Sequence, residues 1–165
     1  MMFWFFSCLE FNGTYKEVPW IDITQFTIAD PLNDIFPDHQ PDEIDCTANG
    51  FQVELDQLEI QTDICNNAIV EWTTQYYIPT GTNFEALVLH TGLWAPEDGN
   101  AHFALSIDGE LFWEEFPVIP SNTEFFFYEA KWPEQVFPGT TVQLHLHNHG
   151  ANDWKLGYFQ PIESE

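Results

Sequence analysis

Residues 101–116 read AHFALSIDGELFWEEF and predict a β-hairpin. The dipeptide Asp108-Gly109 is typical of a two-residue turn between antiparallel strands. The run on each side of it is rich in aromatic and aliphatic residues and has the length of a strand. The stretch therefore makes an antiparallel sheet the starting hypothesis for the rest of the chain.

Similar runs follow one another beyond residue 50, with Pro- and Gly-containing turns about every eight to twelve residues. They are FQVELDQLEI (51–60), AIVEWTTQYYI (68–78), FEALVLH (84–90), EFFFYEAKW (124–132), TTVQLHLHNH (140–149) and DWKLGYF (153–159). No stretch keeps a helical period long enough for a core helix. The pattern predicts an all-β fold, an antiparallel β-sandwich or jelly roll of about eight strands.

Residues 1–45 differ from this pattern and predict an irregular N-terminal arm, followed by the sandwich domain at 46–165. Four prolines interrupt the arm, and FTIAD at 26–30 is at most a short edge strand. The first residues, MMFWFFSC, are apolar but too few to span a bilayer. We expect residues 1–20 to dock on the core of the protein itself, on a partner protein or at a membrane interface, where aromatic side chains are favoured.

The charge of the chain limits its partners. The 165 residues contain 27 Asp and Glu against three Lys and no Arg, which gives a net charge of -24. Phosphate groups are bound mainly by Lys and Arg, so nucleic acid is excluded as a partner. Neutral glycans, metal cations and cationic proteins remain, as does the simpler explanation of an acidic coat that maintains solubility.

The three cysteines indicate an extracytoplasmic location. Cys46 and Cys65 bracket a strand-like run and are predicted to form a disulfide, which an oxidising compartment would favour. Cys8 is left without a partner. The alternative is three reduced thiols in a cytosolic protein.

The stretch QLHLHNHG at 143–150 is the strongest candidate site. Side chains alternate along a strand, so His145, His147 and His149 share the face opposite to Val142 and Leu144. Neighbouring imidazoles on that face are about 6.6 Å apart, and two of them can bind one metal ion. The outer pair is too far apart for all three to bind it.

Two further histidines are expected at the same rim. If the strands that end at His90 and begin at His102 pair, and if strands alternate in direction, both histidines meet the C-terminal three. Histidine ligands suit Cu or Zn, whereas Ca would require carboxylates such as Asp98. A structural polar cluster and a pH-sensing role remain open as alternatives.

A carbohydrate site is the competing hypothesis. Trp94 lies in the long loop 91–100 with Asp98 and Asn100, and an exposed tryptophan can stack on a sugar ring. Catalysis has weak support, because no nucleophile or metalloprotease motif occurs and the adjacent Glu114 and Glu115 point to opposite faces of a strand. A copper oxygenase is the only enzyme class that the histidines would support.

Three stretches, TDICNNAIVEW (62–72), LHTGLWAPEDGNAHFAL (89–105) and GTTVQLHLHNHGANDW (139–154), carry a resemblance. The chain resembles uncharacterised secreted or lipoprotein β-sandwich domains of myxobacteria-like organisms. It is loosely similar to carbohydrate-binding-module jelly rolls and, more faintly, to the C-terminal domain of type II copper monooxygenases. The last similarity implies metal-ligand roles for His145 and His147 only.

The sequence thus leads to three functional hypotheses. The first is a non-catalytic extracytoplasmic module with a Cu or Zn site at His90, His102, His145, His147 and His149. The second is a carbohydrate-binding module that uses Trp94 and the same rim. The third is a structural subunit of a larger assembly, held by its aromatic N-terminus.

Overall fold

The computed structural model describes residues 19–162. Cys8 and nearly all of the segment 1–20 that was expected to dock on a partner lie outside this range. Within the described residues, no helix is long and apolar enough to cross a membrane.

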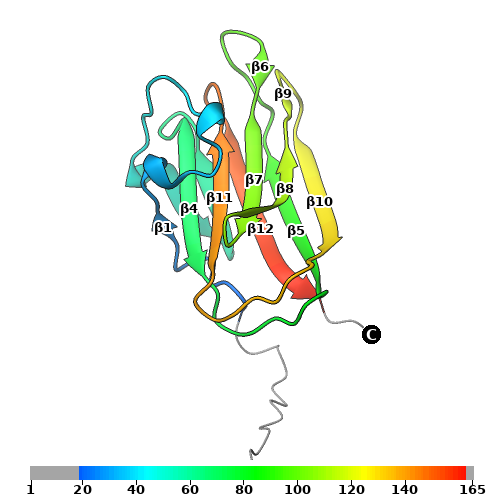
Figure 1. Ribbon diagram of the computed structural model, residues 1–165. Coiled ribbons are helices and arrows are strands. Elements are labelled where there is room, and N and C mark those ends of the chain that lie inside the picture. Colours follow the sequence, from blue (N-terminus) through cyan, green and yellow to red (C-terminus); the bar gives the residue numbers. More distant parts are fainter. Residues whose placement is uncertain (1–18, 163–165) are drawn as a thin grey trace, which may run out of the picture.

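Two five-stranded antiparallel sheets pack face to face, which confirms the predicted sandwich (Figure 1). The first sheet has the order β1-β4-β11-β7-β8, and the second has the order β10-β5-β12-β3-β2. The strands of the first sheet are β1 (Thr27–Ile28), β4 (Asn67–Thr73), β11 (Thr141–His147), β7 (His102–Ile107) and β8 (Glu110–Glu115). Those of the second are β10 (Glu124–Lys131), β5 (Asn83–His90), β12 (Asp153–Ile162), β3 (Gln57–Gln61) and β2 (Phe51–Glu54).

Five short elements complete the fold. Strands β6 (Gly99–Asn100) and β9 (Val118–Ile119) form a separate two-stranded ribbon. Three 3-10 turns, η1 (Pro31–Asn33), η2 (Pro37–His39) and η3 (Ala48–Gly50), lie in the segment before β2.

The hairpin expected from AHFALSIDGELFWEEF is confirmed as β7 and β8. Asp108 and Gly109 have φ angles of 53° and 78°, as a turn with two left-handed residues requires. A second hairpin divides the run at 51–60 into β2 and β3, with positive φ at Leu55 and Asp56. Neither of these turn residues is a glycine, so the sequence pattern gave no sign of that turn.

The core is formed by the alternate residues of each sheet that point inward. Phe84, Ala86 and Val88 of β5 face Leu144 and other buried residues of the first sheet. Burial of such apolar side chains is the main favourable term in folding. The side chains that alternate with them on β5 remain partly exposed.

The N-terminal arm takes part in this core. Trp20 is 1% exposed and makes edge contacts with Phe84 and Phe159, with ring centroids at 4.8 and 5.3 Å. Strand β1 then pairs with the edge of β4, so FTIAD does contain a short edge strand. The chain next crosses the outer face of the first sheet, in front of β4 and β11 (Figure 1).

A disulfide between Cys46 and Cys65 joins the end of the arm to the loop that precedes β4, as predicted. The two cysteines also form an antiparallel bridge between their backbones. The arm is therefore held against the sheet at both ends, by β1 pairing and by the covalent bond.

Candidate functional site

The loop after β11 is shaped by two asparagines of the stretch HNHGAN. Asn148 donates from Nδ2 to Oγ1 of Thr62 at 2.9 Å. Asn152 accepts from the backbone N–H of Trp94 at 2.7 Å and donates to the carbonyl of His149 at 3.0 Å. Both amides are buried, so these hydrogen bonds lock the loop 147–152 to the loop that carries Trp94.

Gly150 allows the two loops to approach. Its φ is +88°, a conformation that favours glycine, and a Cβ atom placed there would overlap the carbonyl oxygen of Trp94. The glycine and asparagines of this stretch thus hold in place the loop that carries His149.

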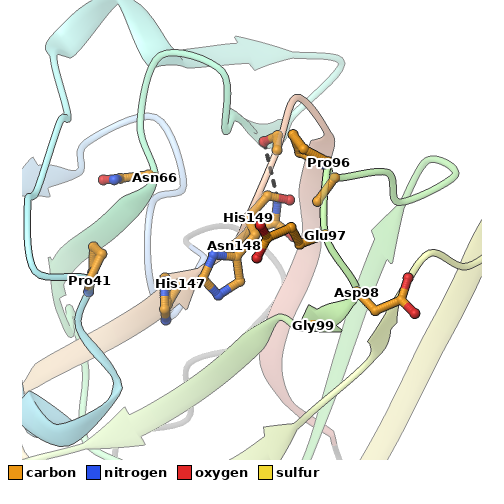
Figure 2. Close-up of a pocket in the computed structure, with 11 residues that line it drawn as sticks. Pro41, Asn66, Pro96, Glu97, Asp98, Gly99, His147, Asn148 and His149 are labelled. Atoms are coloured by element: carbon orange, nitrogen blue, oxygen red, sulfur yellow. Dashed lines mark hydrogen bonds between the residues drawn. The ribbon is translucent and has the colours of Figure 1, made fainter.

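An open hollow of about 420 Å³ lies between these loops and the arm (Figure 2). It is lined by Pro41, Asn66, Ala95, Pro96, Glu97, Asp98, Gly99, His147, Asn148, His149 and Gly150. The rings of His147 and His149 are 4.6 Å apart between centroids. Figure 2 shows Glu97 beside His149, whereas Asp98 stands apart from the two rings. We call this hollow the rim pocket.

Trp94 is 62% exposed and directly precedes Ala95 and Pro96 of the rim pocket. Its backbone is fixed through Asn152, so its position is set even though its side chain is open to solvent. Asn100, which the sequence grouped with Trp94, does not line the pocket. It belongs to β6, where it pairs with Val118 of β9.

His145 is buried, although it lies on the face of β11 opposite to the core residues Val142 and Leu144. The arm covers it, and its Nδ1 lies 2.8 Å from Oδ2 of Asp34, with both side chains fully buried. The ring of Phe36 packs against it at 5.3 Å. Burial alone would raise the pKa of Asp34, but the hydrogen bond and charge of His145 hold it below its usual value.

His102 lies beside His145 on the same outer face, because β7 pairs with β11 and His102 is opposite His147. Its ring is 4.7 Å from that of His145 and 4.4 Å from that of His39 in the arm. Its Nε2 is 3.2 Å from Oε2 of Glu114, and Phe116 stacks on it at 4.3 Å.

The environment of His102 and His147 favours neutral imidazole. Burial, together with the charges of His145 and His39, lowers the pKa of His102 to about 3. Burial, together with the charges of His149 and His145, lowers the pKa of His147 to about 4. A neutral imidazole is the form that binds metal ions.

His90 lies elsewhere, and this corrects the premise that its strand pairs with the strand of His102. Strand β5 belongs to the second sheet, between β10 and β12, because the loop 91–100 crosses from one sheet to the other. The ring of His90 points into the core and packs against Trp154 at 4.8 Å. Its Nδ1 is 2.6 Å from the carbonyl oxygen of Thr91.

The structure thus brings together His102, His145, His147 and His149, adds His39, and separates His90. His39 was not among the predicted site residues, because it lies in the irregular arm, where no periodicity places a residue on a face. Within residues 19–162, four buried histidine ring nitrogens have no hydrogen-bond partner: His102 Nδ1, His145 Nε2 and His147 Nε2 in this cluster, and Nε2 of the separate His90. Among residues 19–162, no three His, Cys, Asp or Glu side chains are arranged to hold a metal ion.

No family model matches the chain, and no curated protein matches it. Solved structures similar to it include a carbohydrate-binding module described as CBM4, with a TM-score of 0.43 and 8% identity over 86% of this chain and 97% of that one. Another is TmCBM61 in complex with β-1,4-galactotriose, with a TM-score of 0.43 and 9% identity over 78% and 94%.

A third is the enzymatically active domain of tailspike protein 4 of bacteriophage CBA120, with a TM-score of 0.40 and 12% identity. The match covers 64% of this chain and spans only 15% of the tailspike chain. At these scores and identities the neighbours decide nothing about function. Only the residues of the site can therefore indicate the function.

Proposed function

We propose that the protein is a non-catalytic, extracytoplasmic module that binds a neutral glycan at the rim pocket. The observation that carries this proposal is Trp94, an exposed indole on a loop with a fixed backbone, next to a hollow lined by polar groups. An aromatic face can stack on a sugar ring, while carboxylates, amides and imidazoles bind its hydroxyl groups. A volume of about 420 Å³ is within the range of small-ligand pockets.

The charges at the site favour a neutral ligand. Glu97 and Asp98 line the rim pocket, and no lysine of residues 19–162 does. An anionic sugar would meet these carboxylates without a cation to balance them. The Cys46–Cys65 disulfide supports the extracytoplasmic location, because such bonds persist mainly in oxidising compartments.

The test is affinity gel electrophoresis against a panel of soluble neutral polysaccharides, comparing the natural protein with Trp94→Ala. We expect a polysaccharide that retards the natural protein to bind the variant at least about tenfold more weakly, the loss of one stacking contact. Phe137→Ala is the matched control, since Phe137 is 53% exposed and is not among the residues that line the pocket. Equal retardation of Trp94→Ala and the natural protein would contradict the proposal.

Metal binding is the second candidate, favoured by the unpartnered ring nitrogens of His102, His145 and His147. Carboxylates already hold the other nitrogen of His145 and of His102, through Asp34 and Glu114. Carboxylates commonly hold metal-binding histidines in this way. We propose Cu or Zn for these rings, and Ca only for an oxygen-rich position near Glu97 and Asp98.

Elemental analysis of untagged protein, after reconstitution and desalting, tests this second candidate. We expect about one equivalent of Cu or Zn, falling at least tenfold in His102→Gln. His90→Gln is the control, because His90 faces the core of the other sheet. Less than about 0.1 equivalent in the natural protein would reject the metal site.

A further inference from the structure

The second sheet carries an exposed aromatic surface that the rim pocket does not use. Phe125 and Phe127 on β10 are 70% and 57% exposed. The residues that alternate with them, Phe126 and Tyr128, pack against the core instead. Soluble proteins rarely expose neighbouring large apolar side chains on one face of a strand. Where they do, the patch commonly marks a binding surface or an aggregation site.

The apolar surface continues across two further strands. Phe125 is opposite Leu89 and Phe127 is opposite Leu87 on β5. Leu87 is in turn opposite Tyr158 on β12. Directly opposed residues share one face of an antiparallel sheet. Leu87, Leu89 and Tyr158 are half-buried on that face. We call Phe125, Phe127, Leu87, Leu89 and Tyr158 the β10 face.

Gly157 leaves room on this surface for the side chain of Leu87. A Cβ atom there would lie 3.1 Å from Cδ2 of Leu87, so the leucine side chain rests over the glycine. The β-bulge between Leu156 and Tyr158 places the glycine at this position. The β10 face is therefore a continuous shelf of side chains that leads to the edge of the sheet.

That edge is open. Strand β10 is the last strand of its sheet and pairs only with β5 among the described strands. Its eight residues contain no proline, so the backbone groups on its outer side can accept another strand (Figure 1). An exposed edge with apolar side chains is suited to strand addition.

The charges beside the edge indicate what kind of strand fits. Glu85 accepts a hydrogen bond from Gln160 at 2.7 Å, and Glu59 lies 2.6 Å from Lys155. Glu129 shares one face of β10 with Phe125, Phe127 and Lys131, and it has no hydrogen bond or ion pair within residues 19–162. A second copy of this chain is a poor partner, because each copy carries a net charge of -24.

From this arrangement we infer that the open edge of β10 binds an extended segment of a partner protein. The segment adds as a strand beside β10. It places two apolar side chains against Phe125 and Phe127 and a lysine or arginine against Glu129. The inference does not depend on glycan binding at the rim pocket, which lies between other loops of the molecule.

The probe is a synthetic decapeptide that has threonine at every second position, so that threonine forms one face of the strand. The other face carries two consecutive valines, to contact Phe125 and Phe127, and then a lysine, to contact Glu129. It is titrated into ¹⁵N-labelled full-length protein at about 0.15 M salt, which weakens unspecific attraction. We expect amide shift changes confined to β10 and β5. The double variant Phe125→Ser/Phe127→Ser should weaken binding at least about tenfold, and Glu129→Gln about threefold.

Two comparisons decide the result. A peptide of the same composition, with valine, lysine and threonine distributed over both faces, should bind at least tenfold more weakly. The variant Leu32→Ser changes a residue of the arm that is 91% exposed, and it should leave binding of the probe unchanged. Equal binding of both peptides, or shifts spread over the whole surface, would overturn the inference. Shifts at β10 with a neutral oligosaccharide, but not with the peptide, would overturn it in favour of a second sugar surface.

Discussion

At the scale of single residues, two positions decide whether the rim and its cover keep their shape. Gly150 lies where two loops meet, and Asp34 lies where the arm meets the sheet. Gly150 is required because a Cβ atom would overlap the backbone of Trp94, and Asp34 is required because it is hydrogen-bonded to buried His145. Each can be tested by one substitution with a control close in kind.

Replacing Gly150 by alanine is expected to cost on the order of 3 kcal/mol of unfolding free energy. The new Cβ atom would overlap the backbone of Trp94, and the φ of +88° at residue 150 would add strain for alanine. Gly139→Ala is the control, because Gly139 has a φ of +92° but no atom within 4 Å of an added Cβ. It should lose only about 1 kcal/mol. Urea denaturation measures both, and equal losses would refute the clash.

Asp34→Ala is expected to lower the unfolding free energy by about 2 kcal/mol, because it leaves buried Nδ1 of His145 without its partner. Asp38→Ala, at an exposed position of the same arm, should change it by less than about 0.5 kcal/mol. Denaturant titration followed by tryptophan fluorescence gives both values. A loss of the same size in the two variants would show that the pair does not stabilise the arm.

At the scale of elements, alternation and turns identified the strands, because they are local signals. The runs at 84–90 and 124–132 coincide closely with β5 and β10. The sheet to which each strand belongs is set by contacts far apart in sequence, so the placement of His90 could not be read from its own strand. The arm has no period, and its cover over His145 therefore left no pattern to detect.

The arm and the first sheet should lose stability together as the metal-free protein is acidified. His102 and His147 have pKa values lowered to about 3 and 4, so the folded protein keeps them neutral while the unfolded chain takes up protons below about pH 6.5. The unfolding free energy should fall from about pH 6.5 towards 4, by about 1.4 kcal/mol per pH unit for each group.

Urea denaturation in the presence of a chelator, repeated from pH 7 to 4.5, measures this slope. His102→Gln removes one of the two groups and should reduce the slope by about 1.4 kcal/mol per pH unit. An exposed acidic variant such as Asp38→Asn should leave it nearly the same. An unchanged slope in His102→Gln would show that this ring does not set the acid sensitivity.

At the scale of the whole molecule, a charge of -24 on 165 residues opposes the compact state through repulsion among carboxylates. Only Lys155 among the described lysines forms salt bridges, with Glu59 and Glu54. Most of the acidic surface is therefore balanced by solvent ions alone.

Raising NaCl from about 0.01 to 0.5 M should raise the unfolding free energy by about 1–2 kcal/mol, or the melting temperature by roughly 3–6 °C, because salt screens this repulsion. Differential scanning fluorimetry measures the shift. The same salt series near pH 4 should give a smaller shift, since many carboxylates are then protonated. A melting temperature that is independent of salt at pH 7 would contradict the repulsion.

The position of the arm also governs how this chain can be recombined with related sequences. Residue 46, the predicted start of the sandwich domain, is the crossover point that the sequence pattern favours. A chimera joined there would take Asp34 and Trp20 from one parent and the surfaces they fit from another. A crossover placed ahead of Pro19 would take Trp20, Asp34 and the surfaces that they contact from the same parent.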